Sequence, residues 1–498
     1  MKSINPLHCI DFYKVGHRSQ YPKGTSLIYA NFTARSARHA NGIFQDSMEE
    51  SPKVVFFGLQ GILNWLLDEL WQEAFFLLPK EEAVKIYEER VVGSLGPVAS
   101  DVSHIEALHD LGYLPIEIRA LPEGSLVDFK VPMLTIHNTL PEFFWLTNFL
   151  ETQLSSELWK SITNATIAYQ YRKMFDKYAE ITGGDPSFCQ WQGHDFSARG
   201  MSGIHDAAKQ GAAHLVSFSG TDTVSAIDYV DEYYYGKGTF VAGSVVASEH
   251  STMSANSKES ELETYRKFIT QIYPEGIVSI VSDTWDYWKV LTEYLPTLKQ
   301  EVLARKGKLV VRPDSGVPEL IINGDPDAIP HSPEYKGSLR LLWEVFGGTI
   351  NEKGYKVLDP HIGLIYGDSI TPERCHDILQ GMEENGFCSS NIVLGLGSYV
   401  YQMQSRDTFG FAMKSTYAEI NDHPVEIFKD PVTDNGTKKS LKGLIQVSQD
   451  PITNKFKVKD QCTWEEANEG ALRTVFENGV VYEEATIHEI RKRLGTFK

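Results

Sequence analysis

Cysteine is scarce in this 498-residue sequence, and none of the five cysteines belongs to a CxxC pair. An odd number of widely spaced cysteines is typical of reduced thiols, not of a disulfide framework or a zinc site. The HExxH and HxH patterns of metal hydrolases are also missing, so we expect no tightly held zinc. Because no GxxxxGKS/T segment is present, a P-loop nucleotide hydrolase is excluded as well.

Basic residues are outnumbered, since 47 lysines and arginines stand against 66 acidic residues and give a formal net charge of −19. A chain this acidic is not expected to present a general surface for nucleic acid or an anionic membrane. Long apolar runs are rare too. In the longest, 54–67, and directly after it, polar residues recur every four positions, at Gln60, Asn64 and Asp68. That spacing predicts one polar stripe on an amphipathic core helix, not a membrane span. The first residues contain no apolar signal segment, so we predict a cytoplasmic protein.

Hydrophobic residues make up 42% of the sequence, as expected for a folded globular protein. Between about 190 and 400, short apolar runs end in polar residues, with helical patterns between them. The residues at these ends lie 27 to 33 positions apart, except for one step of 54: Asp195, Asp222, His250, Asp283, Asp314, Asp368 and Gly397. A spacing near 30 corresponds to one strand plus one helix, so the pattern predicts a parallel β/α array. The long step holds an insertion at 326–354.

Polar residues at the carboxyl end of every predicted strand favour a (β/α) barrel. An open doubly wound sheet is the alternative, but such a sheet concentrates its site at one switch point. Before the array the predicted elements are mixed, and after it we expect an antiparallel hairpin and a short basic helix. We therefore predict an α/β protein in which 151–404 form the barrel, while 1–150 and 405–498 form a flanking α+β domain.

The segment around Arg312 shows the arrangement at one strand end. A short apolar strand, 309–311, is followed by Arg312, Pro313 and Asp314. Proline cannot extend a strand ladder, so the charged pair is placed at the carboxyl end. Arginine can bind two phosphate oxygens at once, and aspartate can accept from ribose hydroxyls or help to hold a divalent metal. For this segment alone, an Arg–Asp ion pair that closes the loop is the simpler explanation.

The other strand ends repeat this chemistry. Together they predict a ring of polar side chains: Asp222, His250, Asp283, Asp314 and Asp368, with Arg199, Arg312 and Arg406 nearby. Such a ring suits a magnesium–pyrophosphate and its ribose. Plainer explanations exist, because Asp222 could be a helix N-cap, His250 a structural histidine and Phe196 a core aromatic. The recurrence at seven strand ends outweighs them.

Several motifs then resemble one family. In chain order they are DFYKVGH at 11–17, HDFSARG at 194–200, GTDT at 220–223, SEHST at 248–252, SD at 282–283, RPDSG at 312–316, GD at 367–368, RD at 406–407 and FKDP at 428–431. The chain resembles the bacterial and phage nicotinamide phosphoribosyltransferases over nearly its whole length. The resemblance implies an irregular (β/α) barrel of the type II phosphoribosyltransferase type, a flanking mixed domain and a homodimer. It also implies the transfer of phosphoribosyl from phosphoribosyl pyrophosphate to nicotinamide, with Mg²⁺ and with coupling to ATP hydrolysis.

The same resemblance implies roles for single residues. Phe196 and Tyr13 of the partner subunit would enclose the pyridine ring. Asp222 would accept from the carboxamide NH₂, Arg199 would bind the carboxamide or a phosphate, and His250 would be phosphorylated by ATP. The positions implied for the ribose are Asp314, Gly367 and Asp368. Those implied for phosphates are Arg312, Arg406, Lys414 and Lys429, together with Arg35 of the partner subunit. Asp11, Ser279, Asp283, Gly397 and Ser398 are further substrate-binding positions. Catalysis would depend on His250, Asp314, Asp222 and Arg312, with Mg²⁺ held mainly through the pyrophosphate, near Asp283 and Asp314.

Two departures from the family pattern concern the phosphate loop and the segment before Arg199. The glycine-rich run of the family is Gly395-Leu396-Gly397-Ser398-Tyr399 here, so the Ser398 side chain either crowds a phosphate or donates to it. The Gly-Tyr that precedes the arginine in the family is Ser-Ala at 197–198.

Three other functions are alternatives for this sequence. A nicotinate phosphoribosyltransferase shares the fold, but Asp222 would repel a carboxylate substrate. A non-catalytic ligand-binding protein would be expected to have lost charged residues that this chain keeps. A sugar-phosphate aldolase barrel needs a lysine at a strand's carboxyl end, whereas Lys308 begins its predicted strand.

Overall fold

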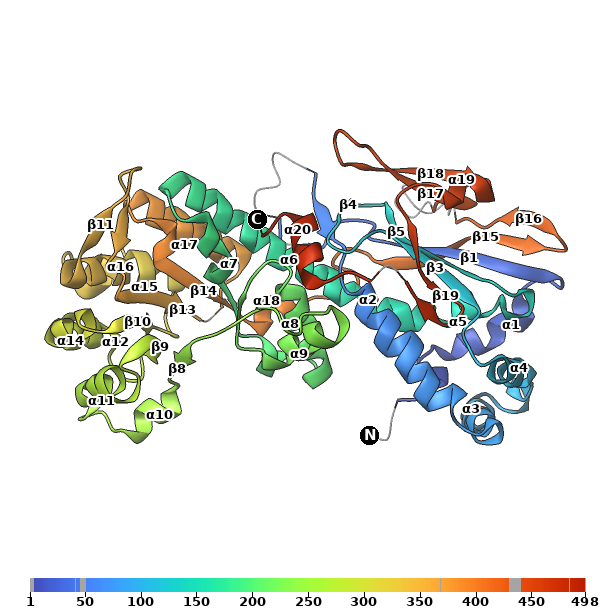
Figure 1. Cartoon of the computed structure of the whole chain (residues 1–498), viewed down its shortest axis with the longest axis horizontal. Coiled ribbons are helices and arrows are strands. Elements are labelled where there is room, and N and C mark those ends of the chain that lie inside the picture. The colour runs from blue at the N-terminus through green and yellow to red at the C-terminus, as the bar shows by residue number, and fades with distance from the viewer. Residues whose placement is uncertain are drawn as a thin grey trace.

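The computed structural model describes residues 4–40, 42–44, 51–367, 369–429, 440–482 and 484–497. The chain is built around two seven-stranded sheets, and the long helix α6 (Glu151–Thr182) runs between them (Figure 1). One face of α6 contacts strands of the barrel, and the helix also contacts the flanking sheet. Its middle turns are accordingly buried, including the polar Thr163, Asn164 and Thr166.

The flanking sheet is antiparallel and takes strands from both ends of the chain. In spatial order these are β16 (His423–Glu426), β15 (Ala412–Ile420), β1 (Thr25–Thr33), β5 (Pro132–Asn138), β3 (Ile116–Ala120), β19 (Arg473–Glu477) and β20 (Val480–Val481). In β3, Ile116 and Ile118 are buried and alternate with half-exposed residues, which is the period-2 pattern of a strand with one wet face. The boundaries at 150 and 404 remain a prediction.

The second sheet is parallel. Its strands are, in spatial order, β7 (Gly220–Thr221), β6 (Gly193–Asp195), β14 (Ile392–Leu396), β13 (Ile362–Tyr366), β10 (Lys306–Arg312), β9 (Glu275–Val281) and β8 (Val246–Ala247). A bridge between Gly220 and Gly243 joins β7 to the segment that leads into β8. The sheet therefore curls back toward its first strand, and the predicted irregular (β/α) barrel is confirmed.

The predicted strand ends agree with the observed ones. The seven parallel strands end at Asp195, Thr221, Ala247, Val281, Arg312, Tyr366 and Leu396, each at or within three residues of a residue predicted for a strand end. Along β10, Leu309 and Val311 are buried, while Lys308, Val310 and Arg312 line a cavity inside the barrel. Alternation along the strand thus sends Arg312 to the interior at the carboxyl end.

Helices follow the barrel strands and cover their outer side (Figure 1). Those of the barrel are α7 (Cys189–Gln192), α8 (Ile204–His214), α9 (Val224–Tyr233), α10 (His250–Ala255), α11 (Glu261–Lys267), α12 (Tyr287–Lys289), α13 (Leu295–Thr297), α14 (Lys299–Leu303), α15 (Pro318–Asn323), α16 (Pro333–Phe346), α17 (Pro372–Glu384) and α18 (Ser398–Gln402). The predicted insertion holds α16 and β11 (Gly348–Ile350), which pairs with β12 (Lys356–Leu358).

The remaining elements surround the flanking sheet. They are α1 (His17–Gln20), β2 (Lys53–Val55), α2 (Leu59–Ile62), α3 (Lys80–Leu95), α4 (Ser103–Leu111), β4 (Leu126–Asp128), α5 (Leu146–Phe149), β17 (Leu444–Gln449), β18 (Phe456–Cys462) and α19 (Trp464–Asn468). β17 and β18 form the predicted antiparallel hairpin. Within the described ranges, no helix is both long and apolar enough to cross a membrane.

The last helix, α20 (Ile487–Leu494), lies against the barrel helices. Its Ile487, Ile490 and Leu494 share a hydrophobic cluster with residues of α8 and α9. Arg491 donates to the carbonyls of Leu215, Phe218 and Val241, and burial lowers the pKa of its guanidinium to about 9. A buried arginine that satisfies several carbonyls fixes the chain end against the barrel.

A buried carboxyl in α11 generates a stability prediction. Glu261 is only 2% exposed, its Oε1 has no hydrogen-bond partner among the described residues, and burial raises its pKa to about 7. Because the folded pKa lies above the unfolded value, this group favours folding at low pH and costs stability as the pH rises toward 7 and beyond. Glu261→Gln should therefore raise Tm more at pH 8 than at pH 5 in thermal denaturation.

The exposed Glu259→Gln controls for the loss of a nearby surface charge. A Tm difference between Glu261→Gln and wild type that is equal at both pH values would contradict the raised pKa.

Candidate functional site

The carboxyl ends of the barrel strands open into a cleft of about 640 Å³. An inner cavity of about 470 Å³ continues from it into the barrel. Phe196, Asp222 and Arg312 line both spaces. The cleft therefore unites seven of the predicted residues: Phe196, Arg199, Asp222, His250, Arg312, Asp314 and Gly367. Asp368 lies outside the described residues.

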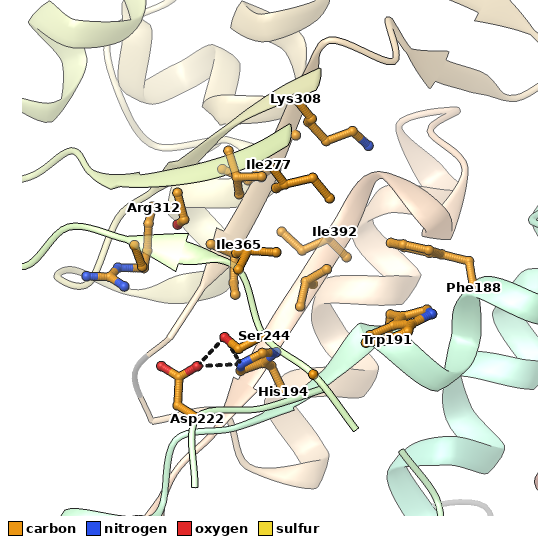
Figure 2. A pocket seen from close by; sticks show the side chains of 18 of the residues that line it. Phe188, Trp191, His194, Asp222, Ser244, Ile277, Lys308, Arg312, Ile365 and Ile392 are labelled. Carbon is orange, nitrogen blue, oxygen red and sulfur yellow. Dashed lines mark hydrogen bonds and ion pairs between the residues drawn. The ribbon is translucent and has the colours of Figure 1, made fainter. Parts of the chain in front are cut away.

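Asp222 is held by two donors (Figure 2). Its Oδ1 accepts from His194 Nε2 at 2.9 Å and from Ser244 Oγ at 2.5 Å. Burial by itself raises the pKa of the Asp222 carboxyl, but these hydrogen bonds and the nearby Arg312 charge outweigh it, and the pKa lies below its ordinary value. The group is therefore an ionised acceptor at neutral pH. The N-cap explanation is wrong, because the N-cap position of α9 belongs to Thr223.

Phe196 lies over a floor made of glycines. A Cβ on Gly395 would lie 2.5 Å from Phe196 Cδ2 and 2.7 Å from the Cα of Gly367. Contacts that short do not occur, so the ring can take this position only because residue 395 has no side chain. Its ring also packs against His194, with the ring centroids 4.8 Å apart. Phe196 is thus fixed with one face available to the cleft.

His250, which lines the cleft, is paired with Asp283, which does not line it. His250 begins α10, its side chain is 48% exposed, and its Nε2 lies 3.0 Å from Asp283 Oδ1. Asp283 Oδ2 accepts from the Asp314 amide and the Ser315 hydroxyl. Burial raises the pKa of Asp283, but these hydrogen bonds and the His250 contact outweigh it and lower the pKa. Asp283 thus fixes the His250 imidazole and the Asp314 backbone, two parts of the cleft lining.

Arg312 enters the cleft from the end of β10. Its Nη2 donates to the carbonyl of Ser248 at 2.7 Å, while its buried Nε has no hydrogen-bond partner among the described residues. An arginine with an unused donor at a cleft is suited to an anion.

The inner cavity is mostly apolar and carries two polar groups of interest. Ser279 is buried and its Oγ has no partner in the described part of the chain. Lys308 also lines the cavity, and burial lowers the pKa of its ammonium. It lies near the start of β10, about 13 Å of strand away from Arg312. This matches the expectation that no lysine stands at a strand's carboxyl end.

Four of the five expected phosphate-binding cations lie elsewhere, and only Arg312 lines the cleft. Lys414 lies in β15. Burial is the main cause that lowers the pKa of its ammonium, and the charges of Arg35, Lys429 and Arg406 add to it against the opposing charge of Glu151. The four cations therefore lie near one another, yet none lines the cleft or the inner cavity. The N-terminal candidates are also apart from it: Asp11 accepts from Thr152 Oγ1, and Tyr13 is 59% exposed.

Ser398 begins α18 directly after Gly397. A Cβ on Gly200 would lie 2.0 Å from Ser398 Oγ, so the serine packs against the turn that carries Arg199. The serine thereby joins the phosphate loop to the Arg199 segment, a contact that the sequence did not indicate.

Two functional residues were missed in the sequence. His194 and Ser244 hold Asp222, but they lie 28 and 22 positions from it in the chain. Alternation along β6 was an available signal, because His194 and Phe196 lie two residues apart and so face the same side. No comparable signal marks Ser244. Asp195, by contrast, is fully buried and accepts from the hydroxyls of Thr221 and Thr223.

Known proteins match this chain along its whole length. The nicotinate phosphoribosyltransferase (NAPRTase) family matches residues 191–480, and the N-terminal domain of nicotinamide phosphoribosyltransferase matches residues 5–118. A nicotinamide phosphoribosyltransferase of Acinetobacter baylyi is 55% identical over 99% of this chain and 97% of its own length. That of Xanthomonas campestris pv. campestris is 33% identical over 97% of this chain and 96% of its own length.

The fold has a counterpart among solved structures. Human nicotinic acid phosphoribosyltransferase has a TM-score of 0.56 and 15% identity, with 98% of this chain and 94% of that chain covered. At this identity the likeness concerns the fold alone. With the sequence matches, it leads to one conclusion: the chain belongs to the nicotinate phosphoribosyltransferase family, alongside its bacterial nicotinamide phosphoribosyltransferase relatives.

Proposed function

We propose that the chain transfers phosphoribosyl from phosphoribosyl pyrophosphate to nicotinamide, giving nicotinamide mononucleotide and pyrophosphate. The observation that carries this proposal is the state of Asp222. Both of its donors bind Oδ1, so Oδ2 remains for a ligand in the cleft beside Phe196. An ionised carboxylate accepts hydrogen bonds and donates none, so it suits a carboxamide NH₂ and repels the carboxylate of nicotinate.

The residues of the cleft supply orientation and charge. The pyridine nitrogen of nicotinamide has no proton to lose, so its attack on ribose C1 needs no general base. Phe196 stacks on the ring and Asp222 fixes its rotation, which aims the nitrogen. Ser279, with its unpartnered hydroxyl, is the second candidate contact for the carboxamide. Asp314 lines the same cleft and suits the ribose hydroxyls.

The departing pyrophosphate develops negative charge, and Arg199 and Arg312 line the cleft to receive it. Among the described residues, no three His, Cys, Asp or Glu side chains converge as a metal cage. An ion that arrives with the pyrophosphate would lie beside Asp314, a carboxylate that lines the cleft. Mg²⁺ bound in this way would neutralise part of the leaving group's charge.

ATP coupling through His250 is part of the proposal. The imidazole is half-exposed at the cleft, and its bond to the ionised Asp283 orients it through Nε2. Phosphoryl transfer from ATP would leave ADP and a phosphohistidine beside the pyrophosphate site. The new charge would be stabilised by Arg312, which lines the same cleft.

A shared site in a homodimer accounts for the separated cations. Arg35, Arg406, Lys414 and Lys429 lie together but outside the cleft of their own chain. We infer that one subunit's cation group, with its exposed Tyr13, meets the cleft of the other subunit. The phosphates would then be enclosed by residues of both chains.

Nicotinate phosphoribosyltransferase activity is the second candidate function. It is favoured by the match of residues 191–480 to a family that is named after that activity. Asp222 counts against it because nicotinate would place two carboxylates together. A non-catalytic ligand-binding role is weaker still, since Arg199, His250, Arg312 and Asp314 are all present in the cleft.

We expect purified protein to form nicotinamide mononucleotide from nicotinamide in preference to using nicotinate. Asp222→Asn and Asp222→Ala should lower the ratio of kcat/KM for nicotinamide to kcat/KM for nicotinate by about 10- to 100-fold, the usual worth of a hydrogen bond to a charged group. The assay supplies each substrate in turn with phosphoribosyl pyrophosphate and Mg²⁺, and measures product by chromatography.

The outcomes separate the candidates. An unchanged ratio in both variants would overturn the role of Asp222, and preferential turnover of nicotinate by the wild type would support the second candidate. ATP should raise product formation by the wild type but not by His250→Ala, and equal stimulation of both would exclude phosphorylation of His250.

The shared site is tested by mixing two inactive variants. Tyr13→Ala removes a residue that acts in the partner's cleft, and Asp314→Ala removes one from its own cleft. After exchange of subunits, a mixed dimer retains one intact site, so activity should return to up to about half of the wild-type level per mixed dimer. Activity that stays at the level of the separate variants would show that each chain forms its own site.

A further inference from the structure

His194 contacts both Asp222 and Phe196, the two residues proposed to select the pyridine substituent and its ring. Figure 2 shows its contact with Asp222. From β6 it donates to Asp222 Oδ1 at 2.9 Å, and its ring packs on Phe196. Because a carboxylate can only accept, Nε2 carries the proton in this bond. His194 is 8% exposed, whereas the side chain of Asp222 is 45% exposed. The imidazole is thus more buried than the carboxylate that it holds, and it lines the inner cavity, not the outer cleft.

The neighbouring strand fixes the imidazole. His194 pairs with Gly220 of β7, and a Cβ on Gly220 would lie 2.7 Å from His194 Nδ1. The absence of a side chain at residue 220 lets the ring lie directly on the backbone of β7. Phe196 covers the ring from its own strand. The ring is therefore held between two strands, with Nε2 aimed at Asp222.

The two oxygens of Asp222 are consequently unequal. Oδ1 receives both His194 and Ser244, and the described residues give Oδ2 no hydrogen bond. A carboxylate pinned through one oxygen presents the other in a fixed direction. Without His194, the Ser244 hydroxyl alone would hold Oδ1, and because that hydroxyl can itself rotate, the Asp222 side chain could turn about its own torsions.

We propose that His194 is the positioning residue for the preference for amide over acid: it pins Asp222 through Oδ1, so that only Oδ2 meets the substrate. The proposal rests on the proposed function and deepens it. The residue need not touch the substrate. Its effect passes through the orientation of Asp222, so its loss should weaken the selection of the carboxamide while leaving the phosphoribosyl pyrophosphate side intact.

Two substitutions separate the hydrogen bond from the packing. The side-chain NH₂ of His194→Gln can reach the position of Nε2, whereas the shorter His194→Asn places its NH₂ near Nδ1. We expect His194→Asn to lower the amide-to-acid ratio of kcat/KM by about 10-fold, mainly through a higher KM for nicotinamide, with KM for phosphoribosyl pyrophosphate within about twofold of wild type. His194→Gln should recover most of the ratio.

The test includes one control variant and one substitute variant. His376→Asn, on the outer helix α17, should leave the ratio unchanged. If His194→Asn fails to fold, as judged by Tm, Gly220→Ala serves instead, because its methyl group displaces the imidazole without removing it. A ratio unchanged in whichever of these variants folds, or equal losses in His194→Gln and His194→Asn, would overturn the proposal.

Failure of the proposed function would look different. In that case the wild type would lack the amide preference, or Asp222→Asn would leave the ratio unchanged. Loss of the ratio in Asp222→Asn but not in His194→Asn would reject the positioning role of His194 alone.

Discussion

The cleft exists because seven parallel strands of a curled sheet end at the same edge. The bridge from Gly220 to Gly243 brings the sheet back toward its first strand, so residues from far apart in the chain face one space. Alternation along each strand sends every second side chain inward, as Lys308, Val310 and Arg312 show on β10. The chain can therefore place an aromatic ring, carboxylates and arginines around one space, close to the ends of rigid strands.

Within this frame, the carboxylates of the site are controlled by donors. Asp222 is held by His194 and Ser244, and Asp283 is held by His250, Ser315 and the amide of Asp314. These bonds lower both pKa values despite burial, so the groups stay charged in a protein that is already strongly acidic. Positive charge is concentrated locally, in Arg199 and Arg312 at the cleft and in the group around Lys414.

The spacing of polar residues was enough to predict the barrel and most of the cleft, because a β/α unit has a nearly constant length. The spacing alone locates the strand ends, and with them Asp222, Arg312 and Asp314, without knowledge of how the strands pack. His194 and Ser244 were missed because their role depends on contact between strands, which chain position does not reveal. The bracing role of Asp283 and the docking of α20 through Arg491 likewise depend on tertiary contacts. The position of Lys414 and its neighbours outside the cleft could not be predicted either, because it too depends on tertiary contacts.

The most direct test of the account is a crystal structure of the protein with nicotinamide mononucleotide and pyrophosphate. The account predicts the pyridine ring stacked on Phe196 and the carboxamide nitrogen within hydrogen-bond distance of Asp222 Oδ2, while Oδ1 keeps its bonds to His194 and Ser244. A carboxamide bound away from Asp222, or an Asp222 that has rotated to leave His194, would contradict it.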